Sequence, residues 1–139
     1  MPELLKKSSE NFSAASLLIE NELYASSVHC SYYSCFQKLK NVISQGYSCD
    51  YEELEVEHRD LNTTLSAKKR LGSHEFFIDR KLLDLIKRER KDHKLISQIN
   101  DIKLYRTDSD YKNKQIIRAD AEAVLSKAEE VLEKLNTLL

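Results

Sequence analysis

Arg106 is the residue whose type and position in the sequence most clearly suggest chemistry. It continues a stripe of apolar residues that recur at helical spacing. That stripe consists of Leu95, Ile99 and Ile102. Burying a guanidinium alone is very costly, so Arg106 needs a carboxylate, backbone carbonyls, water in a cleft or an anionic ligand. Two interpretations stay open: a structural salt bridge to Asp108 or Asp110, or an anion-binding site.

Other familiar catalytic patterns are missing from the sequence. It contains no Gly-rich phosphate loop, HExxH, CxxC or GxSxG motif. The four histidines are dispersed at His29, His58, His74 and His93. We interpret His58 as a half-buried packing residue, and the match Arg88-x4-His93 inside a charge run as coincidence. We expect no metal and no cofactor.

The composition favours an all-α protein. The chain has 139 residues, 41% of them hydrophobic, and only two Gly and one Pro, which leaves little material for hairpin turns. We expect one domain over residues 1–139, folded as an up-and-down bundle of four to five helices. The formal charge of −1 gives no general attraction to nucleic acid, so RNA would need a local patch.

Membrane and redox signals point to a cytoplasmic protein. No apolar run approaches the roughly 20 residues of a membrane span, and the N-terminus lacks a signal-peptide pattern. We therefore expect no membrane partner. The three cysteines are Cys30, Cys35 and Cys49. Cys30 and Cys35 would lie on different sides of one helix, so we expect reduced thiols.

The segment from Tyr24 to Ser44 predicts the central helix of the fold. Its apolar stripe consists of Ala25, Val28, Tyr32, Phe36, Leu39 and Ile43. Pro2 to about Glu20 predicts a preceding helix, and the short link Asn21-Glu22 predicts an antiparallel hairpin. We expect the central helix to end near Gly46, in a left-handed conformation.

Later segments alternate between clear and weak helical patterns. Leu54, His58, Leu61 and Leu65 have helical spacing among many charges, so a helix and a mobile loop both stay open for residues 47–72. The basic run Lys68-Lys69-Arg70 predicts a solvated loop. Ser73 predicts the N-cap of the next helix. Residues 107–114 predict a polar turn. A long last helix follows, with its apolar face at Ile117, Ala121, Val124, Ala128, Val131, Leu135 and Leu138.

Three segments together resemble the HEPN family. Residues 25–43, with their Tyr-Tyr pair between small residues, look like the second helix of HEPN domains. Gly72-Ser73-His74 resembles a small-His element before the family's third long helix. Leu104 to Tyr111 resembles the family segment in which an Arg is followed by Asp-Tyr. These segments, in this order, cover most of the chain.

The resemblance implies a helical homodimer with the arginine segment at a cleft between subunits. Many HEPN proteins are toxin RNases with an R-x(4–6)-H motif, and others are partners of minimal nucleotidyltransferases in toxin–antitoxin pairs. Here no His follows Arg106 at that spacing; Asp110 and Tyr111 stand there instead.

Two functions therefore stay open. As a binding module, the protein would hold a nucleotide, an RNA phosphate or a partner nucleotidyltransferase, in a toxin–antitoxin or defence system, with a site formed by Arg106, Asp110, Tyr111 and Tyr32. We prefer this function. As a metal-independent endoribonuclease, it would use Arg106 for the phosphate and His74 or His29 as the base, with Tyr111 as a further candidate.

Overall fold

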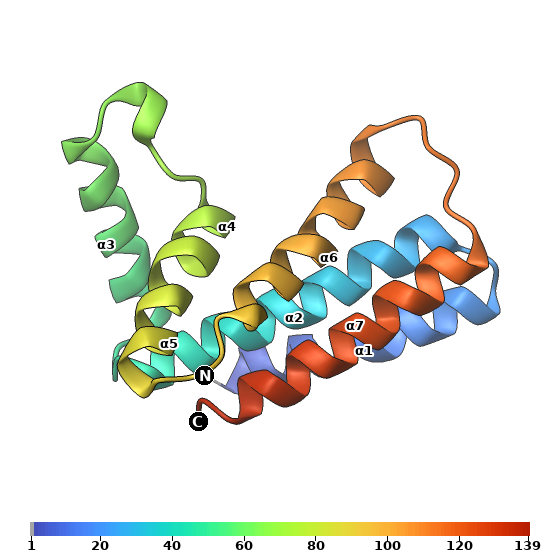
Figure 1. Cartoon of the computed structure of the whole chain (residues 1–139), viewed down its shortest axis with the longest axis horizontal. Helices are drawn as coiled ribbons and strands as arrows, with labels where there is room; N and C mark the ends of the chain where they lie inside the picture. The colour runs from blue at the N-terminus through green and yellow to red at the C-terminus, as the bar shows by residue number, and fades with distance from the viewer. Residues whose placement is uncertain (1) are drawn as a thin grey trace.

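The computed structural model describes residues 2–139, and these residues form helices with no strand among them (Figure 1). The helices are α1 (Pro2–Glu20), α2 (Tyr24–Gly46), α3 (Tyr51–Thr64), η1 (Ala67–Lys69), α4 (Ser73–Glu75), η2 (Phe76–Leu82), α5 (Leu83–Glu89), α6 (Lys94–Tyr111) and α7 (Arg118–Asn136). The expected all-α helical bundle is confirmed. Segments α4, η2 and α5 continue one another as a single rod. The described part of the chain therefore has six main helices, and α3 is the addition to the four or five expected.

Helix α2 is the centre of the fold, as predicted, because it packs against α1, α3, α6, α7 and η2. Its predicted apolar stripe is buried apart from Ala25, which is exposed in the first turn of the helix. Small residues also tie α2 to α1: Ser27 Oγ donates to the carbonyl of Ala15 (2.8 Å), and Ser8 Oγ to that of Ser34 (2.7 Å). Serine side chains at this contact let the two backbones approach closely.

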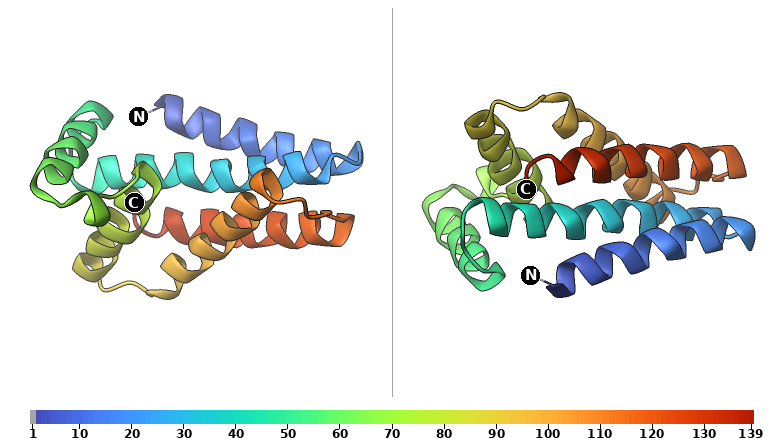
Figure 2. Two further views of the ribbon diagram at one scale, coloured as in Figure 1. Left: turned by 90° about the horizontal axis from the view of Figure 1, so that it is seen from above. Right: turned by 90° about the horizontal axis from the view of Figure 1, so that it is seen from below.

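Helices α1 and α2 form the predicted antiparallel hairpin, and α7 lies alongside them (Figure 2). The link contains Glu22 in the left-handed conformation, with φ 61°. Helix α2 ends at Gly46, as predicted. The left-handed conformation expected for Gly46 is wrong, because its φ is not positive; Ser48 has this conformation instead, with φ 51°. Gly46 is needed for space, since a Cβ there would lie 2.8 Å from Cδ1 of the buried Leu85.

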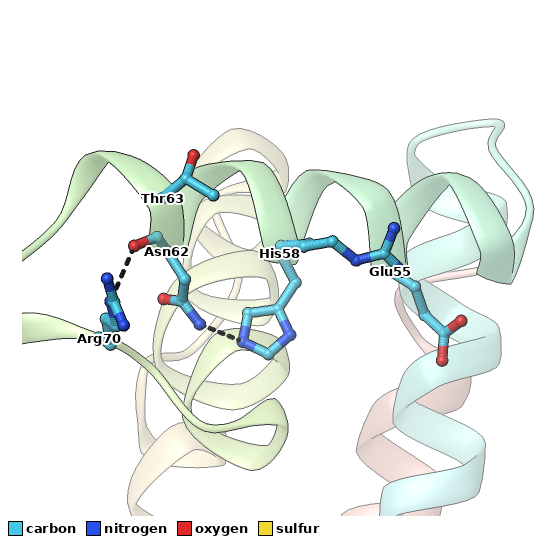
Figure 3. A pocket seen from close by; sticks show the side chains of 6 residues that line it. Glu55, His58, Asn62, Thr63 and Arg70 are labelled. Atoms are coloured by element: carbon cyan, nitrogen blue, oxygen red, sulfur yellow. Dashed lines mark hydrogen bonds between the residues drawn. The ribbon is translucent and has the colours of Figure 1, made fainter. Parts of the chain in front are cut away.

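Residues 47–72 are mainly helical, which resolves the alternative left open by the sequence. Helix α3 begins after Asp50, whose carboxylate accepts a hydrogen bond from the amide of Glu53 (2.8 Å). The following loop folds back on α3 through His58 and Asn62 (Figure 3). His58 is half-buried and stacks on Phe76, as expected of a packing histidine.

The rod from Ser73 to Glu89 differs from the prediction at its start. Gly72, not Ser73, is the N-cap residue, and the Gly72 amide donates to the Glu75 carboxylate (2.6 Å). The π-helical segment η2 was not predicted. It places Phe76, Phe77 and Ile78 in succession in the core. A π-helical turn holds more residues than an α-helical turn, so successive side chains on more than one side of the rod can pack against α2 and α3.

The predicted polar turn over residues 107–114 is wrong in its first part, because α6 continues to Tyr111. Side-chain contacts stabilise this last polar stretch: Thr107 donates to the carbonyl of Lys103, and Ser109 to that of Ala25. The connection to α7 starts at Lys112. Six of the seven predicted apolar positions of the last helix are buried, whereas Ile117 is its N-cap residue and is 51% exposed. Among the described residues, no helix combines the length and apolar character needed to cross a membrane.

Candidate functional site

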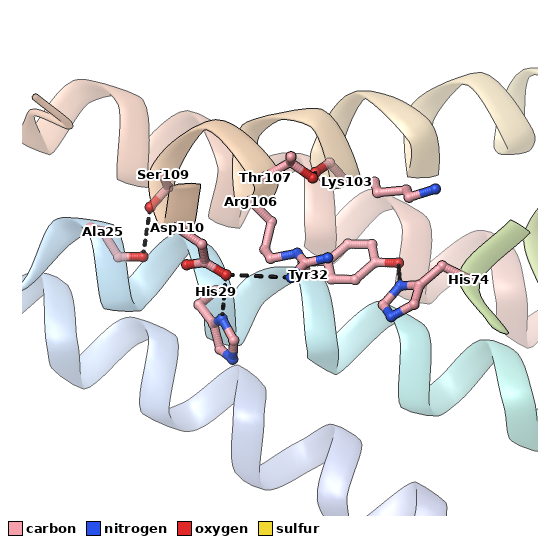
Figure 4. A network of polar contacts seen from close by, with 9 residues as sticks. All are labelled: Ala25, His29, Tyr32, His74, Lys103, Arg106, Thr107, Ser109 and Asp110. Atoms are coloured by element: carbon pink, nitrogen blue, oxygen red, sulfur yellow. Dashed lines mark hydrogen bonds and ion pairs between the residues drawn. The ribbon is translucent and has the colours of Figure 1, made fainter. Parts of the chain in front are cut away.

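Arg106 lies on the inner face of α6 and is only 9% exposed. The three apolar residues that precede it on the stripe are fully or almost fully buried. Its guanidinium carbon lies 5.3 Å from the ring centre of Tyr32 (Figure 4). The same carbon lies 5.5 Å from the ring centre of Tyr33 and 5.9 Å from that of Tyr111. These distances allow cation–π attraction, which offsets part of the cost of removing the charge from water.

The ionic partner of Arg106 is Asp110, one turn further along α6. Arg106 Nη1 donates to Asp110 Oδ2 at 3.4 Å, and His29 Nδ1 lies 3.0 Å from the same oxygen. Of the two carboxylates expected as salt-bridge partners, Asp108 instead pairs with Lys112 (2.9 Å). Arg106 Nε is buried and has no hydrogen-bond partner among the described residues. A guanidinium has five N–H donors, so this one is only partly satisfied.

Tyr32 joins the arginine to His74. The Tyr32 hydroxyl is hydrogen-bonded to His74 Nδ1, and Figure 4 shows the Tyr32 side chain between Arg106 and His74. His74 also stacks on Phe36, with ring centres 4.3 Å apart and planes 1° from parallel. Tyr32 is fully buried, and this burial raises the pKa of its hydroxyl. The pair therefore connects α2 with α4 through two neutral groups, and the Tyr32 ring also contacts the Arg106 guanidinium of α6.

The pKa of His74 is lowered to about 4, first by burial and then by the positive charges of Arg106, Lys103 and Lys40. His74 is therefore neutral at pH 7. The Glu75 carboxylate acts in the opposite direction but more weakly, and it also lies 4.0 Å from Lys103 Nζ. The surroundings of His74 are thus locally positive although the whole chain has a formal charge of −1.

A cavity of about 330 Å³ adjoins the carboxylate of Asp110. It lies between the first turns of α2 and the last turn of α6. Its lining residues are Ala25, Ser26, His29, Cys30, Ser109 and Asp110. His29 and Asp110 are therefore accessible from this cavity, while the Arg106 guanidinium lies behind the carboxylate.

The structure brings together the residues that the sequence singled out. Tyr32 from α2, His74 from α4, and Arg106 and Asp110 from α6 form one network, with Tyr111 at its edge, 75% exposed. His29 joins the network through Asp110.

The pair Arg88 and His93 takes no part in this network. Arg88 Nη2 donates to the carbonyl of Gly46 at 2.7 Å, and His93 is exposed before α6. Among the described residues, no group of three or more His, Cys, Asp or Glu side chains could hold a metal ion.

Three residues near the site were not predicted: Tyr33, Lys40 and Lys103. Tyr33 contacts both Arg106 and His74. Lys40 lies over the Phe36 ring at 4.9 Å, and Lys103 precedes Arg106 by one helical turn. Helical spacing from Phe36 and from Arg106 could have indicated the two lysines, because residues three or four apart share a face.

Comparison with known proteins adds no relative to this description. No protein-family model matches the chain, and no curated protein matches it in sequence. The case for a function therefore depends on the geometry of the site and on the segments that form it.

Proposed function

We propose that this chain is a HEPN-like binding module that holds the phosphate of a nucleotide or of RNA at Arg106. The observation that carries the proposal is the incomplete pairing of the buried Arg106 guanidinium. It is nine-tenths buried, it has one long contact to a carboxylate that His29 shares, and its Nε is unpaired within the described part of the chain. An incoming phosphate could accept from several of its remaining donors in a bidentate arrangement.

The three segments that resemble HEPN domains support this proposal because they meet at one place. The Tyr-Tyr pair of α2, His74 of the small-His element and the Arg106-to-Tyr111 segment all contribute to the network. Figure 4 shows Tyr32, His74, Arg106 and Asp110 from these segments. Two lysines add positive charge there. As in the family, the same surface would face a second subunit or a minimal nucleotidyltransferase of a toxin–antitoxin or defence pair.

Substitution of Arg106 tests the proposal. We expect Arg106→Ala to weaken binding of AMP or a short RNA by about 1.5–3 kcal/mol, the usual value of a charge-assisted hydrogen bond. Arg106→Lys should recover part of the loss, because a point charge cannot reproduce a bidentate fork. Tyr111→Phe should have a milder effect. Isothermal titration calorimetry and thermal melting of the same variants provide the two measurements.

The competing interpretation is that Arg106 has a structural role alone. In that case Arg106→Ala would lower the melting temperature while ligand affinity stayed at the wild-type value. A wild-type protein that binds neither AMP nor RNA in the millimolar range would also contradict the proposal.

A metal-independent endoribonuclease is the second candidate, and the position of His74 favours it. A neutral imidazole can accept a proton, and His74 supplies one from outside the missing R-x(4–6)-H motif, next to Tyr32 and Arg106. If this candidate is right, RNA cleavage should persist in EDTA and fall by about 10² or more in His74→Ala. Cleavage that is unchanged in this variant would exclude His74 as the base.

A further inference from the structure

One oxygen of the Asp110 carboxylate lies where two donors from different helices meet. Arg106 Nη1, from α6, lies 3.4 Å from Asp110 Oδ2, and His29 Nδ1, from α2, lies 3.0 Å from the same atom. Figure 4 shows both contacts at this carboxylate. Because both distances end at one oxygen, the guanidinium and the imidazole converge on one point. A single oxygen of a bound anion at this point would therefore contact both groups.

The Asp110 side chain can leave this point without any change in the core. Asp110 lies in the last turn of α6, its side chain is 23% exposed, and it lines the cavity of about 330 Å³ between α2 and α6. Arg106 is one turn earlier and is held among the rings of Tyr32 and Tyr33. Rotation of the Asp110 carboxylate into the cavity would leave the guanidinium in place and open to that side. The cavity is therefore the route by which a ligand would reach Arg106.

The charges of this cluster favour a proton on His29 once an anion is bound. While the imidazole is neutral, the positive charge of Arg106 and the negative charge of Asp110 cancel. A phosphate ester adds at least one negative charge, so the cluster with its ligand is negative. Protonation of the imidazole restores neutrality, and histidine is the side chain whose charge most readily changes near neutral pH.

The other groups around His29 leave it as the one that would take up this proton. Its ring packs on the uncharged phenol of Tyr33, with ring centres 4.7 Å apart. The adjacent Cys30 is a thiol whose pKa is raised by burial, and the more distant His74 has a pKa of about 4. Among the described residues, the ion pair with Asp110 is the only one that His29 forms, so no charge of α1 is paired with it. The imidazole is 46% exposed, so it can exchange protons with solvent.

We propose that the Asp110 carboxylate occupies the position of one phosphate oxygen, and that the ligand displaces it and binds Arg106 together with protonated His29. This inference rests on the proposed function of Arg106 as a phosphate-binding residue. It adds a second ligand-binding residue, a route of entry and the uptake of a proton from solvent on binding. Because the coupling between the two ligands is reciprocal, phosphate binding should strengthen as the pH falls through the range in which histidine titrates.

Calorimetric titration with the dinucleotide adenylyl-adenosine between about pH 5.5 and pH 8 tests this coupling. Its phosphodiester keeps one negative charge over this range, whereas a phosphate monoester itself titrates at about pH 6. We expect the affinity to rise about fourfold from the upper to the lower pH, which is the effect of one added charge about 5 Å from the phosphate at the dielectric constant of water. Titrations in two buffers that differ in ionisation enthalpy should show proton uptake.

His29→Gln is the test variant, because glutamine can donate a hydrogen bond but takes up no proton in this range. We expect this variant to bind the dinucleotide equally well at both ends of the pH range, without proton uptake. His93→Gln is the matched control, since His93 is exposed before α6 and takes no part in the network. It should keep both the pH dependence and the proton uptake. Thermal melting shows whether each variant is folded.

Failure of this inference can be distinguished from failure of the proposed function. If Arg106→Ala weakens binding of the dinucleotide but the affinity of the wild type does not change with pH, the role of His29 is wrong and the proposed function is unaffected. Persistence of the pH dependence in His29→Gln would have the same meaning. If the dinucleotide does not bind in the millimolar range at any pH, the proposed function is contradicted, and this inference with it.

Discussion

The Asp110 carboxylate contacts both the Arg106 guanidinium and the His29 imidazole, so substitution of Asp110 can distinguish an anion-binding role of Arg106 from a structural one. Its Oδ2 lies 3.4 Å from Arg106 Nη1 and 3.0 Å from His29 Nδ1. In a structural ion pair the carboxylate and the guanidinium stabilise each other. In an anion site the carboxylate competes with the ligand for the same donors. An anion site therefore predicts a higher affinity when the charge of Asp110 is removed, whereas a structural role alone predicts an unchanged affinity.

We expect Asp110→Asn to raise the affinity for a phosphate ligand while it lowers stability. Removal of one negative charge about 5 Å from the ligand is worth about 0.8 kcal/mol even at the dielectric constant of water, which is about fourfold in affinity. Calorimetric titration with AMP, together with thermal melting, measures both effects. Asp108→Asn is the control, since Asp108 pairs with Lys112. A fall in affinity with Asp110→Asn would contradict an anion site at Arg106.

His74 should make the stability of the protein depend on pH. Its pKa is about 4 in the folded state against an ordinary value of 6.5, so the unfolded chain binds the proton more readily. The stability is therefore fully present above pH 6.5 and decreases as the pH falls toward about 4. We expect the melting temperature to fall over this range by more in the wild type than in His74→Gln.

Thermal melting of both proteins in matched buffers across that range measures the difference. The comparison removes the contribution of carboxylates that titrate in both proteins. If the melting temperatures of the wild type and His74→Gln fell by the same amount over this pH range, His74 would be accessible to protons in the folded state.

At the scale of elements, the contact between the end of α2 and α5 depends on the absence of one methyl group. A Cβ at Gly46 would lie 2.8 Å from Leu85 Cδ1 and 3.0 Å from Cδ2, and Leu85 is fully buried. We expect Gly46→Ala to destabilise the protein by about 1–3 kcal/mol through overpacking, although alanine is the better helix former by about 1 kcal/mol. Chemical denaturation measures the change.

The matched control uses the Leu85→Val background, which removes both Cδ atoms. There the same Gly46→Ala change should be neutral or stabilising, and the double-mutant cycle should show strong coupling. If Gly46→Ala lowered the free energy of unfolding equally in both backgrounds, overpacking against the Cδ atoms of Leu85 would not be the cause.

Helices with a long apolar stripe could be predicted from sequence because burial on one face leaves a direct periodic signal. The stripes of α2 and α7 are examples. Ala25 and Ile117 were wrongly expected to be buried, because both lie at the start of their helices, where the side chains are exposed. The extension of α6 to Tyr111 could not be predicted this way. It is stabilised by side-chain contacts such as Ser109 with Ala25, which lie 84 residues apart. The π-helical segment η2 is likewise a consequence of packing.

The candidate site was predictable in part for the same reason. Arg106 could be found because it interrupts an apolar stripe. Its contact with Asp110 follows from helical spacing, since the two residues are four apart. The hydrogen bond between Tyr32 and His74 spans 42 residues and the locally positive surroundings combine three elements, so both required the fold. Only the resemblance to a family placed His74 among the candidates.

At the scale of the whole molecule, two large apolar side chains are exposed on α6 near the site. Leu104 is 60% exposed and Tyr111 is 75% exposed, and seven residues separate them, so they share a face. If this face meets a second copy, light scattering should give twice the chain mass of 16.2 kDa, and Leu104→Lys should shift the protein toward the monomer. Leu17→Lys on α1, with 59% exposure, is the control. A wild-type protein that is monomeric at high concentration would contradict the prediction.

Helix α3 has only one fully buried residue, Leu54, whereas the α1–α2 hairpin and α7 share a continuous core. Such a helix can detach in a sub-global opening that leaves the long helices folded. Its amides should then exchange with solvent at a lower free energy than those of α2, and the loop after it should be the first place that a protease cuts. Because the loop is held to α3 by the contacts of His58 and Asn62 with Leu71, mild denaturant should release the loop before it disturbs the pair of Tyr32 and His74.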